Sequence, residues 1–376
     1  MAKNKTTNSV PSKKKMNPLL KALIWILSII GALILCVALF FGWLTITEYR
    51  PADKEEVTVT SAFTDTYEIV PGSVMSLLTG NIGYGALDEN ADFFMDGGTS
   101  VMTASKQIVS YNLESMTDCI SELAPTFVFL QEVDVDSKRS YNINEATHFY
   151  DTLNKKAKYQ AALAYNFKVK YIPYPIPPIG KVNGGIMTLS THTVSEATRI
   201  KLPTPFSWPT RLGNLKRCLL ITRIPVGEHE LVLINVHLEA YDSGEGKIEQ
   251  TKILKSVIEE EIKKGNYVIA GGDFNQTFSN IDTSMYPAYE GKWQCGNIDI
   301  SEFSGVTFIM DNSHPTCRSL DQAYAGSDKE NFQYYMIDGF IVSDNISVLS
   351  CETLDYEFKY TDHNPVLLQF RLKRDN

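Results

Sequence analysis

The sequence predicts a layered α/β domain that is preceded by one membrane-spanning helix. From about residue 60 onward, short strand-like apolar stretches alternate with longer stretches in which apolar residues recur every three or four positions. Several connections between the strand-like stretches are too short for a crossover helix, so the sheets should be mixed or antiparallel. The third observation is one long segment near the N-terminus that contains no charged residue.

The uncharged segment covers residues 22–47 and is long enough to cross a hydrocarbon core of about 30 Å. A signal peptide is the competing interpretation, but its apolar part usually has only about 7 to 15 residues and ends in small side chains. Here Phe40, Phe41 and Trp43 occupy that end. We therefore expect a transmembrane helix over residues 22–47.

The lysines around this segment predict its orientation. Residues 1–21 contain six lysines and no acidic residue. Because an excess of lysine marks the cytoplasmic side, residues 1–21 should form a cytoplasmic tail. The rest of the chain should then lie outside the cell, as in a single-pass protein of the cell membrane. Residues 48–60 are expected to be a short linker, and residues 61–376 the folded domain.

The part of the chain after the span is acidic. Residues 51–376 contain 28 basic and 43 acidic residues, which gives a net charge of −15. This balance is poorly suited to nonspecific binding of phosphate backbones. It argues against a protein that coats nucleic acid, although a bound metal ion and a local basic patch would still allow a nuclease.

Strand-like and helix-like stretches follow one another in a regular order. The first helix of the domain has its apolar face between residues 109 and 123 and stops before Pro125. A second helix is expected at residues 248–262, closed by Gly265. The strands are expected at residues 74–78, 127–130, 186–189, 218–224, 231–234, 267–270, 340–342 and 366–370.

Polar side chains fall repeatedly at the ends of these apolar strands. They are Asn81, Gln131, Glu132, Asn235, His237, Asp273, Asn275, Asp362 and His363. Side chains at strand ends can converge on one rim while the sheets hold them rigidly. Taken singly, each position has an ordinary explanation as a solvated strand edge, a structural histidine or a tight turn.

The residue types in this set suit metal-assisted chemistry on a phosphate ester. Oxygen ligands such as Asn81, Glu132 and Asp362 suit Mg²⁺, which keeps water and phosphate oxygens in the rest of its coordination shell. An aspartate such as Asp273 can orient or deprotonate an attacking water. A histidine can stabilise or protonate the phosphoryl oxygens.

The order and spacing of six segments resemble the endonuclease/exonuclease/phosphatase superfamily over residues of about 60–372. The matching segments are residues 80–82, 129–133, 235–238, 272–275, 337–340 and 361–366. The resemblance implies a four-layer sandwich, in which two mixed β-sheets pack face to face with helices outside. It also implies a divalent-metal-dependent phosphoric ester hydrolase that works by metal-assisted attack of water.

The same resemblance implies a metal site. Glu132 resembles the principal metal ligand, with Asn81 and Asp362 in or near the metal shell, and the ion is expected to be Mg²⁺, with Mn²⁺ as the alternative. Two departures from the pattern lie beside these ligands. Gly80 stands where many relatives carry an aromatic or larger residue, and Thr361 stands where many carry serine.

Five further residues resemble the catalytic groups of that superfamily. Asp273 resembles the residue that positions or activates water, and Asn275 resembles its neighbour that orients phosphate. His363 resembles the histidine that contacts the scissile phosphate, with Asp338 supporting it. His237 is similar to the second histidine of the nuclease and sphingomyelinase branches.

Two apolar, proline-rich stretches bear on the substrate. Residues 171–180 and 205–209 cannot form a regular helix or a central strand, so they should be loops or edges. They would either make a rim that touches lipid or covers a substrate, or pack on their own domain. Together with the tether and the acidic charge, they favour a lipid head group over nucleic acid as the substrate.

Two other functions remain open. One is a membrane-held extracellular nuclease, for which seven basic residues would form a phosphate-binding face. These are Lys168, Lys170, Lys181, Lys201, Arg211, Lys216 and Arg217. The other is a catalytically inactive binding module of the same fold, against which the complete set of site residues argues.

One sequence pattern bears on the type of membrane. Asn275 begins an acceptor pattern for N-glycosylation, and a glycan on this residue would block the predicted site. A compartment without such glycosylation avoids the conflict. This favours a bacterial plasma membrane.

Overall fold

The structure is a computed structural model that describes residues 16–61, 63 and 67–374. Its contacts divide the chain into two compact units, residues 1–47 and residues 48–376. Most of the predicted lysine-rich tail lies outside the described residues.

The first unit contains one long helix, α1 (Pro18–Ile46). It begins after Asn17, whose side chain accepts a hydrogen bond from the amide of Leu19, and Pro18 occupies the first turn, where a missing N–H costs nothing. Within the described residues, α1 is the helix that is long and apolar enough to cross a membrane. An anchor and a signal sequence both fit this length and composition.

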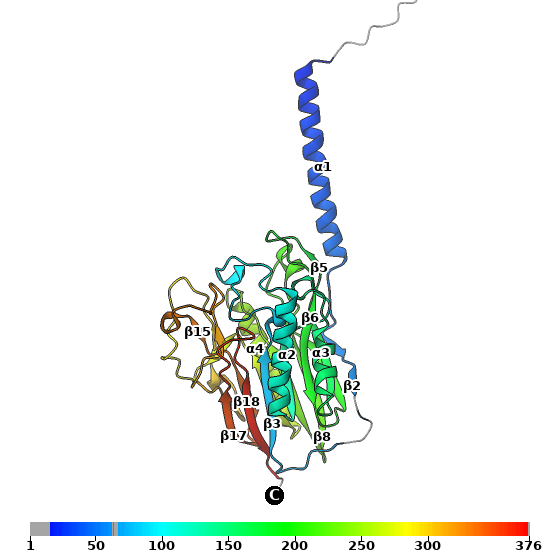
Figure 1. The fold of residues 1–376 in the computed structure, drawn as a ribbon. Helices are drawn as coiled ribbons and strands as arrows, with labels where there is room; N and C mark the ends of the chain where they lie inside the picture. Colours follow the sequence, from blue (N-terminus) through cyan, green and yellow to red (C-terminus); the bar gives the residue numbers. More distant parts are fainter. Residues whose placement is uncertain (1–15, 62, 64–66, 375–376) are drawn as a thin grey trace, which may run out of the picture. The chain divides into compact units, whose positions relative to one another are not determined.

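Two seven-stranded sheets form the second unit (Figure 1). The first sheet has the strand order β1-β7-β8-β9-β10-β16-β13. Its strands are β1 (Lys54–Glu56), β7 (Glu196–Lys201), β8 (Cys218–Val226), β9 (His229–His237), β10 (Tyr267–Asp273), β13 (Val306–Ile309) and β16 (Asp338–Ser343). Only β9 and β10 are parallel neighbours, so the sheet is mixed.

The second sheet repeats this arrangement with the strand order β17-β18-β3-β4-β6-β5-β2. Its strands are β2 (Val59–Ser61), β3 (Met75–Asn81), β4 (Phe127–Asp134), β5 (Gln160–Ile172), β6 (Gly180–Ser190), β17 (Ile346–Thr353) and β18 (Val366–Leu372). Here β3 and β4 are the parallel pair. Two small sheets complete the strands: β11 (Gln276–Phe278) with β12 (Gly296–Ile298), and β14 (Cys317–Arg318) with β15 (Tyr334–Tyr335).

Helices cover the outer faces of the two large sheets. Apolar side chains of α2 (Lys106–Leu123) and α3 (Glu145–Leu153) pack in one buried cluster with Val128 and Leu189 of the second sheet. Those of α4 (Glu245–Lys263) pack with Val232 and Val268 of the first sheet. The short 3₁₀ turns are η1 (Gly83–Gly85), η2 (Phe94–Asp96), η3 (Lys138–Ser140), η4 (Thr210–Gly213), η5 (Ile300–Glu302) and η6 (Lys329–Asn331).

The largest apolar layer lies between the two sheets. Phe127, Phe129 and Phe370 of the second sheet meet Leu233 and Phe340 of the first, and all five side chains are fully buried. Strands that are covered on both faces must be apolar on both faces, which explains why β4 and β9 appear in the sequence as continuous apolar runs. The predicted four-layer sandwich of two packed mixed sheets with helices outside is confirmed.

Residues 48–60 differ from the expected linker. They belong to the second unit, and they contain β1 and β2. β1 pairs with β7 at the edge of the first sheet, and β2 pairs with β5 at the edge of the second. Exposed edge strands tolerate charged side chains, so the charged composition of this segment did not distinguish an edge strand from a linker.

Candidate active site

The eight residues predicted for the site meet at one end of the two sheets. The parallel pairs β3 and β4, and β9 and β10, end there, and the antiparallel strands β16 and β18 begin there. The eight are Asn81 (end of β3), Glu132 (β4), His237 (end of β9), Asp273 (end of β10), Asn275 (after β10), Asp338 (start of β16), and Asp362 and His363 (before β18). The topology therefore brings residues from across about 280 positions of sequence to one rim.

A break in the strand ladder aims Glu132 at this rim. The register between β4 and β6 shifts between Leu130 and Val133, and Glu132 has a φ of 57°. Such a bulge redirects a side chain at a cost in backbone strain. The Glu132 side chain is 23 % exposed, so it can meet a ligand that arrives from solvent.

Asn81 connects the two sheets at the site. Its side-chain amide donates to Asp273 Oδ2 at 3.1 Å and to Glu132 Oε1 at 3.3 Å, while its Oδ1 accepts from the amide of Gly83. The hydroxyl of Thr361 donates to the backbone carbonyl of Asn81 at 3.0 Å. Asn81 is therefore fixed by partners on both of its polar atoms and on its backbone.

Asp338 holds His363 by a short hydrogen bond. Nδ1 of His363 lies 2.8 Å from Asp338 Oδ2, and Nε2 lies 3.9 Å from Asp273 Oδ2. Burial by itself lowers the pKa of His363, but the negative charges of Asp338, Cys317 and Asp362 and the hydrogen bond to Asp338 together outweigh burial and raise this pKa well above its ordinary value. The geometry favours an imidazolium whose Nε2–H points into the site.

The pKa of His237 is shifted in the opposite direction to that of His363. Its Nε2 lies 3.5 Å from Asp273 Oδ2 and 3.9 Å from Glu132 Oε1. Burial lowers the pKa of His237 well below its ordinary value, and the positive charge of Arg217 lowers it further. Nη1 of Arg217 donates to the backbone carbonyl of His237 at 3.1 Å. The two histidines of the site therefore differ in charge near neutral pH.

Asp273 lies at the centre of the cluster. Its Oδ1 accepts from the amide of Asn275 at 2.8 Å, and its Oδ2 faces Asn81 and both histidines. Burial and the negative charge of Asp338 raise the pKa of Asp273 to about 7. A carboxylate with a pKa near neutral is well placed to accept a proton.

Two carboxylates of the site, Glu132 and Asp362, repel each other, and a divalent cation would offset this repulsion. Burial raises the pKa of Glu132, and the negative charge of Asp362 raises it further, so the two carboxylates lie close together without full compensation. Oδ1 of Asp362 accepts a hydrogen bond from the Thr361 hydroxyl. A hard cation relieves this repulsion, and carboxylate and amide oxygens are the ligands it prefers. Asn81, Glu132 and Asp362 therefore fit such an ion.

Besides the group Cys317, Asp362 and His363, the ligand atoms of Asp273, Asp338 and His363 also all lie within 4.8 Å of one another. Asp338 and His363 are already bonded to each other, which makes this group less suited to a metal ion and better suited to proton transfer.

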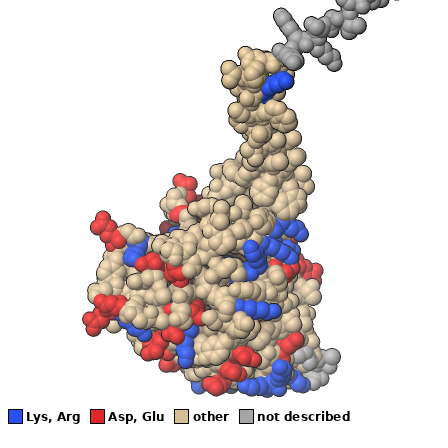
Figure 2. All heavy atoms as spheres, turned by 45° about the horizontal axis from the view of Figure 1, so that its top comes forward, with Lys and Arg blue, Asp and Glu red and all other residues tan. Residues whose placement is uncertain are grey.

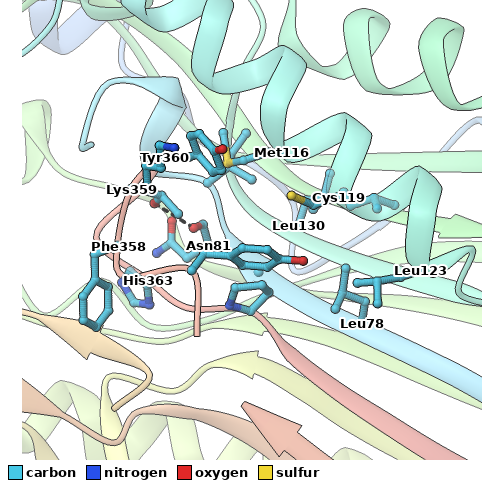
Figure 3. Close-up of a pocket in the computed structure, with 16 residues that line it drawn as sticks. Leu78, Asn81, Met116, Cys119, Leu123, Leu130, Phe358, Lys359, Tyr360 and His363 are labelled. Carbon is cyan, nitrogen blue, oxygen red and sulfur yellow. Dashed lines mark hydrogen bonds between the residues drawn. The ribbon is translucent and has the colours of Figure 1, made fainter. Parts of the chain in front are cut away.

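An apolar pocket borders the site on one side (Figure 3). α2 contributes Met116, Cys119 and Leu123 to its wall, and the loop before β18 contributes Phe358 and Tyr360. Asn81 and His363 also line it, so both residues have apolar surface on one side and the polar cluster on the other. Apolar surroundings lower the local dielectric constant and strengthen the interactions within the cluster.

Gln131 and Asn235, which the strand-end pattern included without a role, join the two sheets beneath the site. Nε2 of Gln131 donates to Asn235 Oδ1 at 2.8 Å and to Thr79 Oγ1 at 3.2 Å. Nδ2 of Asn235 donates to the backbone carbonyls of Met187 and Leu130 at 2.9 and 3.3 Å. Gln131 and Asn235 are fully buried. The role of this pair depends on a contact between sheets, which no local pattern reveals.

Asp96 and Tyr241 were not predicted. The Tyr241 hydroxyl donates to Asp96 Oδ1 at 3.1 Å. Burial raises the pKa of Asp96 to about 7, and the negative charges of Asp362 and Glu132 raise it further. Asp96 lies in a stretch without periodicity, so its sequence neighbours carry no signal of this position.

Arg139 was also not predicted, and it supports the site through contacts with Asp134 and Tyr84. Its Nε and Nη2 donate to Asp134 at 2.9 and 3.0 Å, and its guanidinium lies 3.8 Å from the centre of the Tyr84 ring. The Asp134 side chain is fully buried. Arg139 also exerts the largest opposing electrostatic effect on the raised pKa of Glu132.

Replacing Arg139 with methionine should lower the free energy of unfolding by about 3–5 kcal/mol, because Asp134 would keep a buried charge without a partner. Urea denaturation monitored by circular dichroism measures this change. Lys252→Met is the matched control, since both partners of the Lys252–Glu249 pair are exposed, and it should leave unfolding nearly unchanged. Equal effects of the two substitutions would contradict a structural role for Arg139.

Comparisons with known proteins agree with this geometry. A model of the Endonuclease/Exonuclease/phosphatase family matches residues 109–363, a range that includes all the predicted site residues except Asn81. No curated protein matches the sequence.

Several solved structures share the fold. One is an endonuclease/exonuclease/phosphatase protein from Beutenbergia cavernae, with 17% identity, coverage of 80% of this chain and 72% of that chain, and a TM-score of 0.53. Another is from Bacteroides vulgatus, with 15% identity, coverage of 80% and 100%, and a TM-score of 0.50. ANGEL2, a 2′,3′-cyclic phosphatase, was solved with adenosine-2′,3′-vanadate and has 12% identity, coverage of 85% and 99%, and a TM-score of 0.50.

Proposed function

The chain belongs to the endonuclease/exonuclease/phosphatase family, and from this premise we propose that it is a membrane-tethered, divalent-metal-dependent phosphoesterase. It hydrolyses phosphodiester or phosphomonoester bonds at the outer surface of the membrane that holds α1, with lipid head groups as the favoured substrates.

Three residues are the metal ligands in this proposal. Asn81, Glu132 and Asp362 hold a divalent cation, which is Mg²⁺ or Mn²⁺. When bound, the cation supplies positive charge that offsets the negative charge of the phosphate oxygens. The bulge at Glu132 and the three hydrogen-bonded groups of Asn81 keep these ligands in place before substrate arrives.

The remaining residues handle protons and the phosphate. Asp273 orients the attacking water and accepts its proton, which suits a carboxyl group with a pKa of about 7. His363 donates a hydrogen bond from Nε2 to a phosphate oxygen, and Asp338 keeps it protonated and oriented. Neutral His237 and the side chain of Asn275 border the position of the phosphate.

The observation that best supports action at a membrane is the position of Glu48, the first residue of the folded unit. Glu48 Oε1 lies 3.2 Å from Lys216 Nζ, and the backbone amide of Lys216 donates to the carbonyl of Asn166 at 2.6 Å. Asn166 lies in β5. The residue that follows α1 and its C-cap is thus attached through Lys216 to β5 at Asn166.

The strand pairing relates this part of β5 to the active-site residue Glu132. Tyr165, next to Asn166, pairs with Gly185 of β6, and Gly185 pairs with Val133, the neighbour of Glu132. Glu48 is thus linked to the strand of Glu132 through Lys216, β5 and β6, at the same end of the domain. A phosphoester in the head-group layer of the membrane would therefore lie near the rim of the site.

The structure reduces the support for a nuclease that grips nucleic acid with its surface charges. Five of the seven basic residues considered for a phosphate-binding face are paired with carboxylates. These are Lys181, Lys201, Arg211, Lys216 and Arg217. A membrane-held extracellular nuclease nevertheless remains the second candidate, because the catalytic set suits both substrates.

Orientation and type of membrane also belong to the proposal. The lysine excess before the span supports a cytoplasmic N-terminus and an external domain. The glycosylation pattern at Asn275 supports a bacterial plasma membrane, because Asn275 is 6 % exposed and lies beside Asp273.

Metal removal tests the reaction class. The full-length chain, reconstituted in phospholipid vesicles, is expected to lose hydrolysis after treatment with EDTA and to regain it when Mg²⁺ or Mn²⁺ is added in excess. EDTA that is already saturated with Mg²⁺ is the control and should not inhibit. Undiminished hydrolysis without divalent ions would contradict a metal-dependent mechanism.

The substrate is tested by offering vesicle lipids, single-stranded DNA and double-stranded DNA to the same preparation. Release of a phosphorylated or dephosphorylated head group, measured by mass spectrometry, is expected with lipids. Cleavage of DNA alone would replace the lipid proposal with the nuclease.

A further inference from the structure

The β5–β6 hairpin projects beyond the rest of its sheet. The last pair between β4 and β6 is Asp134 with Gly184, whereas β5 and β6 continue to pair as far as Ile172 with Gly180. The hairpin therefore extends past the rim of the active site at the same end of the domain. In its loop, Tyr174 is 73 % exposed and Ile176 is 88 % exposed.

A third large apolar side chain lies on the neighbouring loop. Trp208 is 52 % exposed and lies just before η4. This loop is next to the hairpin, because a side chain on Gly213 at the end of η4 would contact Ile172, which forms the last pair before the hairpin loop. Large apolar side chains exposed on adjacent loops commonly mark a surface that binds a partner.

Cations accompany these apolar side chains. Arg50, Arg211 and Lys216 all lie within 3.3 Å of the carboxylate of Glu48, which leaves this cluster with a net charge of +2. Lys168 and Lys170 add two exposed charges on β5. Figure 2 shows several groups of Lys and Arg side chains on the visible face, some of them beside Asp and Glu side chains.

We propose that this surface contacts an anionic lipid bilayer. It is called here the docking surface and consists of Tyr174, Ile176, Trp208, Lys168, Lys170, Arg50 and Arg211. Apolar side chains at loop tips with cations behind them match the layers of an anionic membrane, in which acyl chains lie beneath charged head groups. The contact is distinct from α1, and its partner is lipid rather than another protein.

The connectivity of the chain supports lipid as the partner. Glu48 is two residues after the last residue of α1, so its Cα lies within about 7 Å of the end of that helix in any arrangement of the two units. Glu48 in turn binds Arg211 and Lys216. If α1 spans a membrane, the docking surface is confined to the vicinity of that membrane without any assumption about the tilt of the helix.

The consequence is a fixed orientation of the active site. A single helix followed by a free domain would let the site face any direction. A second contact through the docking surface turns the strand-end rim toward the bilayer, so that lipid head groups reach Glu132 and Asp273 without leaving the membrane. This inference rests on the proposed membrane anchor and adds the surface by which the domain lies on the lipid.

An environment-sensitive fluorophore tests the contact directly. Ile176→Cys and Leu349→Cys are prepared in the full-length chain, each combined with Asp273→Asn so that no lipid is consumed. Both are labelled with a nitrobenzoxadiazole dye and reconstituted in vesicles that contain phosphatidylglycerol. Leu349 is the matched control, because it is 45 % exposed and lies in β17 at the opposite edge of the second sheet.

The dye at position 176 should show a blue-shifted emission and quenching by brominated lipids, and the dye at position 349 should show neither. The labelled parent chain, which has the native cysteines only, gives the background. Equal responses at the two positions would overturn the docking surface.

Charge reversal tests the electrostatic part with different readouts. Lys168→Glu combined with Lys170→Glu should lower hydrolysis of vesicle lipids by at least about tenfold, because each lysine near an anionic surface contributes substantially to binding. Hydrolysis of a small soluble phosphodiester should stay unchanged. Lys252→Glu combined with Lys263→Glu on α4 is the control, with neither substrate affected.

Equal loss with both substrates would overturn the docking surface, since it would indicate damage to the site or the fold. The proposed function can fail separately. Hydrolysis of DNA alone, with the dye at position 176 still in lipid, would remove the lipid substrate and leave the docking surface in place.

Discussion

Replacing Asp273 with asparagine is expected to lower turnover by roughly 10²- to 10⁴-fold, the usual contribution of a positioned general base. The substitution keeps the shape of the side chain and an oxygen that can accept from the amide of Asn275. It removes the group that can take a proton from water. The measurement is the turnover number with saturating Mg²⁺, on vesicle lipid and on a small soluble phosphodiester.

Two controls make this result interpretable. Asp299→Asn changes an exposed aspartate that caps η5, and it should leave turnover unchanged. Thermal unfolding of the Asp273→Asn chain should resemble that of the parent chain, which would show that the fold is intact. Turnover within about threefold of the parent would mean that Asp273 does not act as the base, since even the low end of general-base catalysis is larger.

Replacing Gly272 with alanine is expected to destabilise the fold strongly. Gly272 lies in β10 beside Asp273 and has a φ of 141°, a conformation that residues with a side chain rarely adopt. A Cβ atom would lie 2.1 Å from the carbonyl oxygen of Val236 in the neighbouring strand. Backbone strain and displacement of β9 should together cost about 3–5 kcal/mol of unfolding free energy.

Gly291→Ala separates the cost of backbone strain from the cost of the clash with the neighbouring strand. Gly291 also has a positive φ, 79°, but a Cβ atom there would have no neighbour within 4 Å. It should cost only about 1 kcal/mol, because the conformational strain remains and the clash is absent. The comparison is made by urea denaturation of both variants. If the two alanines cost the same, the close approach of β9 and β10 does not constrain position 272.

The sequence predicted which residues meet at the strand-end rim better than it predicted their surroundings. Asn81, Glu132, His237 and Asp273 each follow an apolar strand, and this local pattern was sufficient because parallel strands bring their carboxyl ends together. What the structure adds is that all eight predicted positions lie at one rim.

Long-range contacts explain what sequence reasoning missed. β5 is thirteen residues long, yet the sequence did not predict it, because its first residues alternate only weakly between apolar and polar. Asp96 and Arg139 reach the site from irregular segments, where no periodicity marks them. Gln131 and Asn235 became meaningful only when two sheets were seen to pack against each other.

The segment that holds β1 and β2 has a practical consequence for the shortest chain that can be expected to remain soluble. β1 covers the edge of β7, and β2 covers part of the edge of β5. A chain that started at residue 62 would lack both strands and would leave unpaired N–H and C=O groups along two sheets at once. Such edges pair with strands from other molecules. A chain that lacks α1 together with the segment of β1 and β2 is therefore expected to aggregate much more than a chain that lacks α1 alone. Residue 48, where the folded unit begins, is the appropriate first residue for a soluble form.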